Sequence, residues 1–164
     1  MIRVAKIEDI VSITEIYNQA IDARFQTAFT ERVTIEERTV WFNGHTEGAY
    51  PVFVYVIDEK VVGWVSISPY RSGRAALRFC VEISYFVHQD HQRKGIGSQV
   101  LEHAVKACRD LHYRAVLAII LDKNESSIRL IEKAGFEKWG YLPGVADFDG
   151  VVCGHVYYGN TIVR

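Results

Sequence analysis

The chain has 164 residues, of which 49% are hydrophobic and 24% charged, and its formal net charge is −1. This length and composition are typical of one globular domain with its own core, and we expect a single domain over residues 1–164. The balanced charge disfavours a broad nucleic-acid-binding surface, and no apolar run approaches the ~20 residues that a membrane span requires.

The N-terminal segment predicts a strand, a helix and an irregular loop. Residues 2–6 alternate between apolar and polar side chains, and residues 9–20 have apolar side chains at helical spacing. Residues 22–33 have no clean period, which predicts a loop with a short helical turn. Its aromatic side chains, Phe25 and Phe29, are equally consistent with shaping a pocket and with closing an edge of the core.

A capping box predicts the start of the next helix. Thr34 occupies the N-cap position and Glu37 the third helical position, and the helix is expected to run to about His45. Aromatic side chains of this size are expected to pack inside the protein. The tryptophans assigned to the core are Trp41, Trp64 and Trp139.

Three strands are predicted in the middle of the chain. Residues 52–57 and 61–68 flank a tight turn, Asp58-Glu59-Lys60, which indicates an antiparallel hairpin. A loop over residues 69–76 leads to a third strand over residues 77–87. The three strands are therefore expected to form a meander.

The second half of the chain predicts a parallel crossover. A helix over residues 95–111 is followed by the apolar run 115–121, which is typical of a strand covered on both faces. A strand, a helix and a strand in this order usually join parallel neighbours. Asn124 is expected to cap a further helix that ends at Gly135. Two last strands are expected over residues 136–142 and 151–162.

The loop between the third strand and the long helix has the features of an anion site. It reads Gln92-Arg93-Lys94-Gly95-Ile96-Gly97 and leads directly into the helix. Backbone N–H groups converge at a helix N-terminus, the macrodipole adds positive charge there, and glycine allows a phosphate to approach closely. The spacing is not Gly-x-Gly-x-x-Gly, and the chain lacks alternating strands and helices, which disfavours a dinucleotide-binding fold.

Cysteines and histidines indicate reduced thiols and no metal centre. The three cysteines, Cys80, Cys108 and Cys153, are far apart and odd in number, which favours reduced thiols in a cytoplasmic compartment. His88 and His91 lie three residues apart without a third ligand nearby, so no metal site is expected. The other histidines are expected at the surface or in packing contacts: His45, His103, His112 and His155.

The chain resembles a known superfamily over essentially its whole length. Residues 92–97 match the acyl-CoA pyrophosphate motif of the GNAT N-acetyltransferases, Gln/Arg-x-x-Gly-x-Gly/Ala. Residues 124–136, which begin Asn-Glu-Ser-Ser and end Ala-Gly-Phe, are similar to the second signature. The closer resemblance is to phosphinothricin-type acetyltransferases, and it is carried by Ile16-Tyr17-Asn18, Trp41-Phe42 with His45, Pro51-Val52, Val62-Gly63-Trp64 and Val81-Glu82-Ile83-Ser84.

The resemblance implies the GNAT fold, a mixed and mostly antiparallel central sheet of the α/β (α+β) class. Its middle strands splay apart, helices flank it, and acetyl-CoA lies in the gap. Pantetheine would bind the free strand edge, much as an added strand does. The residues implied for the cofactor are Tyr85, Phe86 and Val87 for pantetheine, Arg93, Lys94, Gly95, Ile96, Gly97 and Ser98 for the pyrophosphate, and Asn124 for the pantetheine region.

Glu82 is the candidate general base. A primary amine arrives as an ammonium ion, so a group must remove a proton before the amine attacks the thioester. Glu82 lies in an apolar strand, and burial there would raise its pKa. The alternative is that Glu82 forms a structural pair with a nearby arginine. In the family the loop before this strand approaches the acceptor, which implies that Arg71, Ser72 and Arg74 contact it. The alternative is that the two arginines are solvated surface residues.

Two departures from the family pattern concern the general acid and the acceptor. Many relatives have Tyr, or His, after the helix leucine, whereas Ile131 follows Leu130 in this chain and cannot donate a proton. Tyr85 or a bound water is the remaining source of a proton. Phosphinothricin acetyltransferases proper have a Lys-Phe-Gly-Arg-Trp-type segment near the end, whereas residues 145–150 read Val-Ala-Asp-Phe-Asp-Gly, which weakens phosphinothricin itself as the acceptor.

The expected function is acetyl transfer from acetyl-CoA to a small primary amine. The resemblance favours an amino acid or an amino-acid-like toxin of the phosphinothricin or methionine sulfoximine type as the acceptor. Two alternatives remain open, a protein N-terminal or polyamine acetyltransferase and a non-catalytic acyl-CoA sensor. The family often forms homodimers, so a homodimer is expected by resemblance.

Overall fold

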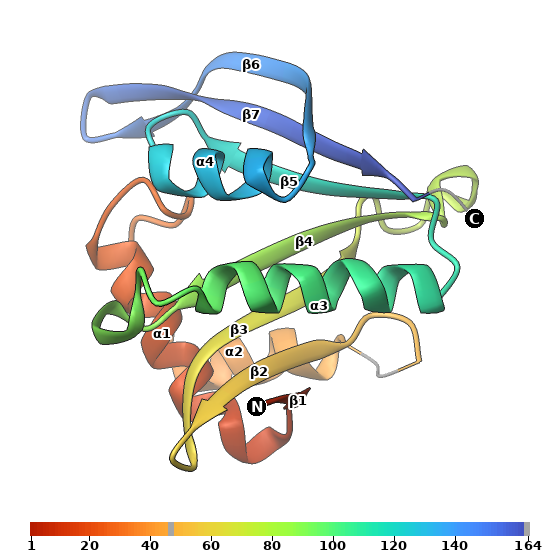
Figure 1. The fold of residues 1–164 in the computed structure, drawn as a ribbon. Helices are drawn as coiled ribbons and strands as arrows, with labels where there is room; N and C mark the ends of the chain where they lie inside the picture. Colours follow the sequence, from red (N-terminus) through yellow and green to blue (C-terminus); the bar gives the residue numbers. More distant parts are fainter. Residues whose placement is uncertain (46–47, 163–164) are drawn as a thin grey trace.

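The computed structural model describes residues 1–45 and 48–162. Within these residues, seven strands form one mixed sheet in the order β1-β2-β3-β4-β5-β7-β6 (Figure 1). The strands are β1 (Ile2–Val4), β2 (Val52–Ile57), β3 (Lys60–Pro69), β4 (Cys80–Val87), β5 (Ala115–Leu121), β6 (Glu137–Phe148) and β7 (Val151–Thr161). The α-helices are α1 (Ile10–Asp22), α2 (Ile35–Asn43), α3 (Ile96–Asp110) and α4 (Glu125–Lys133).

The predicted meander is present, with one boundary moved. Strands β2, β3 and β4 pair antiparallel, and the β2–β3 turn places Asp58 and Glu59 at positive φ, 46° and 64°. The third strand begins at Cys80, not at residue 77 as expected. Residues 75–77 instead form a 3-10 turn, because the Leu77 N–H donates to the Arg74 carbonyl and is unavailable to a sheet.

The centre of the sheet is splayed, as the resemblance implies. Strands β4 and β5 pair in parallel only at their first residues, Cys80–Glu82 opposite Ala115–Leu117. Residues 83–87 of β4 have no pairing to β5, whereas the opposite edge of β5 pairs with β7 over its whole length. Figure 1 shows the two strands diverging from this junction. One edge of β4 therefore keeps backbone groups that are free to bind a ligand.

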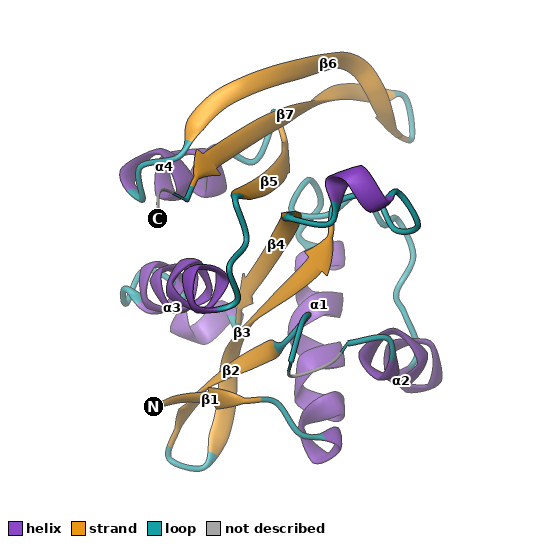
Figure 2. Cartoon of the chain, turned by 90° about the vertical axis from the view of Figure 1, so that its right-hand side faces the viewer, coloured by secondary structure: helices purple, strands orange, loops and turns teal. Residues whose placement is uncertain are grey.

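Helices cover both faces of the sheet. Helices α3 and α4 lie on one side of the strands, and α1 and α2 lie on the other (Figure 2). On the α3 side, buried Val100, Leu101 and Ala104 pack against β3 and β4. On the α1 side, Ile13 and Ile16 pack around Trp64. No helix in the described part of the chain is long and apolar enough to cross a membrane.

The tryptophan prediction is correct for one residue and wrong for another. Trp64 is 1% exposed, Trp41 is half-buried, and Trp139 is 46% exposed. Trp139 lies on β6, the edge strand, so no further element covers it. Its indole instead lies across Gly159 of β7, where a Cβ atom would come within 2.1 Å of the ring. The tryptophan thus covers a glycine on the neighbouring strand instead of entering the core.

Candidate functional site

Two adjoining cavities lie along the splayed strand β4. The first, the donor groove, has a volume of about 290 Å³ and lies beside the loop that leads into α3. The second, the acceptor cavity, has a volume of about 330 Å³ and lies on the α1 side of the sheet. Gln26 and Phe86 line both cavities, so the two spaces meet at these residues.

The donor groove brings together most of the residues expected to hold the cofactor. Those that line it are Tyr85, Phe86, Val87, Arg93, Gly95, Gly97, Ser98 and Asn124. Two side chains of the expected set do not line it. The Lys94 ammonium donates to the Asp90 carbonyl at 2.8 Å, and the Ile96 side chain is 3% exposed within the core.

The loop geometry directs backbone amides into the donor groove. Arg93 and Gly95 have positive φ, 58° and 80°, and Gly95 is the N-cap of α3. The first N–H groups of a helix have no intrahelical acceptor, and the macrodipole makes them an anion site. At Gly97 a Cβ would lie 3.0 Å from the Leu130 side chain, so α3 and α4 approach closely beside the groove.

Asn124 caps α4 at the opposite wall of the donor groove. Its side-chain oxygen accepts a hydrogen bond from the Ser127 amide at 3.3 Å, as the sequence predicts. The Ser127 hydroxyl lies 2.9 Å from the Tyr85 hydroxyl. Burial raises the pKa of Tyr85 to about 12, so this phenol stays protonated and is available as a proton donor.

The acceptor cavity has a floor formed by two paired strands. On β4, Glu82, Ser84 and Phe86 share one face by alternation, and they lie opposite Ser68, Ser66 and Trp64 of β3. The remaining walls come from α1, α2, the loop after α1, β5 and β7. The residues that these elements contribute are Tyr17, Arg38, Trp41, Gln26, Thr27, Ala28, Phe29, Ile119, Leu121, His155 and Tyr157.

Glu82 is the only carboxylate among the described residues that line the acceptor cavity. Burial raises the pKa of Glu82 above its ordinary value. No hydrogen bond or ion pair to its side chain occurs within residues 1–45 and 48–162, so the arginine pair weighed as an alternative is not formed there. A half-buried carboxylate with a raised pKa is a stronger base than an exposed one, as a general base requires.

The sequence also matches a family model over most of its length. The model described as the acetyltransferase (GNAT) family covers residues 13–136. The chain belongs to this family. Its donor groove fits acetyl-CoA, because a free strand edge lies beside amide-rich glycine backbone, and the chain is an acetyl-CoA-dependent N-acetyltransferase.

Relatives and solved structures agree with the GNAT fold. YwnH of Bacillus subtilis, which carries the provisional name phosphinothricin acetyltransferase, is 38% identical over 151 residues, 91% of each chain. The L-methionine sulfoximine/L-methionine sulfone acetyltransferase of Salmonella typhimurium is 33% identical over 88% of this chain and 84% of its own. A phosphinothricin acetyltransferase from Sinorhizobium meliloti in complex with acetyl-CoA has a TM-score of 0.93 at 29% identity, covering 99% of this chain and 88% of its own.

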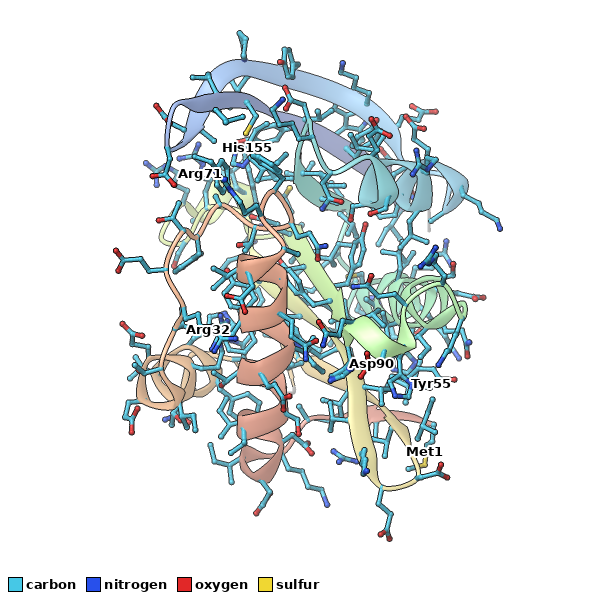
Figure 3. The ribbon with its side chains drawn as sticks, turned by 90° about the vertical axis from the view of Figure 1, so that its left-hand side faces the viewer. Met1, Arg32, Tyr55, Arg71, Asp90 and His155 are labelled. Atoms are coloured by element: carbon cyan, nitrogen blue, oxygen red, sulfur yellow. The ribbon has the colours of Figure 1, made fainter. Side chains whose placement is uncertain are left out.

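The acceptor side of this GNAT enzyme was only partly predicted. The loop after α1 does line the cavity through Thr27 and Phe29, whereas Phe25 packs against Phe148 at a centroid distance of 4.9 Å. No helical turn forms within that loop after α1 ends. Arg71, Ser72 and Arg74 are exposed and line neither cavity. Figure 3 shows Arg71 and His155 at the same end of the molecule.

Several cavity residues, Arg38 among them, were assigned elsewhere or not singled out by the sequence. His155 was expected at the surface or in packing contacts, yet it is half-buried and lines the acceptor cavity. Tyr157 lies two residues later, and Ser66 and Ser68 have the same spacing on β3. Polar residues at period two in otherwise apolar strands are a usable signal for a polar pocket wall.

Proposed function

We propose that this enzyme transfers an acetyl group from acetyl-CoA to the primary amine of an amino acid or an amino-acid-like compound. Phosphinothricin and methionine sulfoximine represent the class of acceptor, because the chain is similar to enzymes named for these compounds. One observation carries the proposal. The donor groove opens, at Gln26 and Phe86, into a cavity whose only described carboxylate is Glu82.

In this proposal Glu82 is the catalytic base. Its carboxylate takes a proton from the ammonium group, directly or through one water, and the free amine then attacks the thioester carbonyl. The aromatic walls exclude bulk water, which strengthens the electrostatic interactions in the cavity. Tyr17, Trp41 and Phe86 are among these aromatic wall residues.

The donor groove orients the acetyl group in the same proposal. Residues 85–87 offer unpaired backbone groups to pantetheine, and the amides of residues 93–98 hold the pyrophosphate, with Lys94 and Ile96 contributing backbone only. Asn124 binds the pantetheine region. The Tyr85 hydroxyl, hydrogen-bonded to Ser127, supplies the proton for the leaving thiolate, since Ile131 is a fully buried aliphatic residue.

The loop over residues 69–76 is assigned to the mouth of the acceptor cavity. Arg71, Ser72 and Arg74 are exposed in this structure, and a planar guanidinium is suited to binding carboxylates and phosphinates. These three residues would contact the outer part of an acceptor. Residues 1–164 would act as one N-acetyltransferase domain.

The proposed function predicts a defined pattern in a thiol-release assay. Acetyl-CoA would be incubated with proteinogenic amino acids, methionine sulfoximine, methionine sulfone, phosphinothricin and the polyamines spermidine and putrescine. We expect at least one amino-acid-type amine to be turned over with a kcat/KM at least about tenfold above both polyamines, because the cavity has one described carboxylate and several uncharged walls. Binding of acetyl-CoA without turnover of any amine would instead favour the non-catalytic sensor.

We also propose that the enzyme is a cytoplasmic homodimer that uses the surface of β6 and β7. The described cysteines are all free, as a reducing compartment requires. Strand β6 is an edge strand, and apolar side chains gather on this hairpin. The exposed apolar side chains are Trp139, Tyr141, Leu142, Val145, Val151 and Val152.

The dimer predicts a mass change on substitution of one exposed valine. Light scattering after size exclusion should give twice the chain mass for the unchanged protein. Val152→Asp, at a side chain that is 55% exposed, should shift the mass toward the monomer, because an unpaired charge would be buried in the interface. Val40→Asp, on α2 and 74% exposed, is the matched control and should leave the mass unchanged. A monomer at all concentrations would contradict the proposal.

A further inference from the structure

A buried arginine that forms no ion pair with the described residues lines the acceptor cavity. Arg38, in the middle of α2, is 6% exposed. Its guanidinium carbon lies 3.9 Å from the centroid of the Tyr17 ring and 4.6 Å from that of Trp41. No ion pair to Arg38 occurs in the described ranges 1–45 and 48–162. Fully buried arginines are rare in proteins unless a carboxylate or another acceptor pairs with them.

Two buried donors of residues that line the cavity have no acceptor among the described residues. The Nε atom of Arg38 and the Nε1 atom of Trp64 are both fully covered, and neither has a hydrogen-bond partner in the described part of the chain. Both residues line the acceptor cavity. Aromatic packing explains where the guanidinium lies, but rings accept few of its N–H groups. Unpaired buried donors are costly. Neither of these two atoms has accessible surface, so a ligand in the cavity would meet the Arg38 guanidinium through its terminal nitrogens, which are not among the fully covered unpaired atoms.

The cation lies at the end of the cavity where the donor groove enters. Trp64 pairs with Phe86 across the β3–β4 ladder, and Phe86 lines both cavities. Glu82 pairs with Ser68 further along β3. No ion pair between Arg38 and Glu82 occurs in residues 1–45 and 48–162, so the acid does not neutralise the cation. Burial lowers the pKa of Arg38, partly offset by the Tyr17 hydroxyl, but a guanidinium stays charged in proteins.

We propose that the Arg38 guanidinium binds the carboxylate of the acceptor amino acid. This inference rests on the proposed function and makes Arg38 a specificity-determining residue inside the cavity, separate from the loop arginines at its mouth. A planar guanidinium presents parallel N–H donors that match the two oxygens of a carboxylate. The aromatic rings hold it in one orientation and exclude the water that would compete for it.

The test compares one amino acid with its own amide in two enzyme forms. Methionine sulfone and methionine sulfone amide differ in the carboxylate, and the ratio of their kcat/KM values measures carboxylate recognition. Arg38→Gln should lower this ratio by about 10- to 100-fold, the loss expected for a charge-assisted hydrogen bond. The amide also changes the acidity of the amine, but this effect is the same for both enzyme forms and cancels in the comparison.

Matched variants separate recognition from packing. Arg38→Lys keeps the charge but loses the planar fork, and it should lower the ratio less than Arg38→Gln does. Arg109→Gln, at an exposed position at the end of α3, should leave the ratio unchanged. If Arg38→Gln lowers kcat/KM equally for the acid and the amide, the arginine has only a packing role and the inference is wrong.

The outcomes also distinguish this inference from the proposed function. If the unchanged enzyme binds acetyl-CoA but acetylates neither compound nor any other amine, the proposed function fails. If it acetylates methionine sulfone and the ratio is the same in Arg38→Gln, only the assignment of Arg38 fails. Should Arg38→Gln not fold, Arg38→Met fills the same site with a long apolar side chain that has no donor, and a fall in the same ratio is expected there too. An unchanged ratio in Arg38→Met would then overturn the assignment.

Discussion

Glu82→Gln is expected to lower kcat by about 100- to 10,000-fold while leaving the Kd for acetyl-CoA unchanged. The amide keeps the size of the side chain but cannot accept a proton from the ammonium group. The donor groove does not include Glu82, so the cofactor should bind as before. Steady-state kinetics and calorimetry with acetyl-CoA measure the two quantities separately.

The pH dependence of the same variant gives a second readout. Burial raises the pKa of Glu82, so its base form is lost as the pH falls through a value above that of an exposed glutamate. The kcat/KM of the wild-type enzyme should therefore decrease as the pH falls through the pKa of Glu82. In Glu82→Gln, the decrease of kcat/KM that is caused by protonation of this carboxylate should be absent. Glu102→Gln, at an exposed position on α3, is the control. Near-normal turnover in Glu82→Gln would rule out the base assignment.

Gly97→Val is expected to raise the Kd for acetyl-CoA by about 100-fold, equal to about 2.7 kcal/mol. A Cβ at this position already lies 3.0 Å from the Leu130 side chain and 3.9 Å from that of Val87, and all three residues line the donor groove. The two added methyl groups would occupy space beside the first amides of α3. The pyrophosphate could then no longer approach these amides closely.

Stability and affinity must be separated for this variant. Replacing a helical glycine improves helix propensity, which offsets part of the crowding against Leu130. The free energy of unfolding, measured by thermal melting, should therefore change much less than the free energy of acetyl-CoA binding. Gly48→Ala, where a Cβ meets nothing within 4 Å, is the control for a glycine substitution outside the groove. An unchanged Kd for acetyl-CoA in Gly97→Val would contradict the assignment of this loop to the cofactor site.

The parts of the fold that the sequence predicts well are those with local causes. Thr34 and Glu37 form the expected capping box, because each bonds the other's backbone N–H within one turn. The turn at Asp58 and Glu59 and the cap at Asn124 likewise depend on neighbouring residues. The start of the third strand was misplaced because backbone bonds in residues 74–78 compete with the sheet.

The acceptor cavity was less predictable because distant segments build it. Five different elements contribute Tyr17, Arg38, Ser66, Glu82 and His155. These side chains lie near one another only because of the way in which β4 and β5 separate in the folded sheet. Only Glu82 could be singled out, since a carboxylate in an apolar strand is unusual wherever that strand lies. The donor groove was accessible because most of it comes from one continuous stretch, residues 85–98.

The short pairing between β4 and β5 has a thermodynamic consequence. Three residue pairs join the β1–β4 part of the sheet to the β5–β7 part, and beyond them the ladder is open. A pantetheine arm that bonds the free edge of β4 would replace missing backbone bonds in the middle of the sheet. Occupancy of the groove then adds to the free energy of unfolding by RT ln(1 + [L]/Kd). Bound acetyl-CoA would therefore stabilise the fold of the enzyme as well as serve as its substrate.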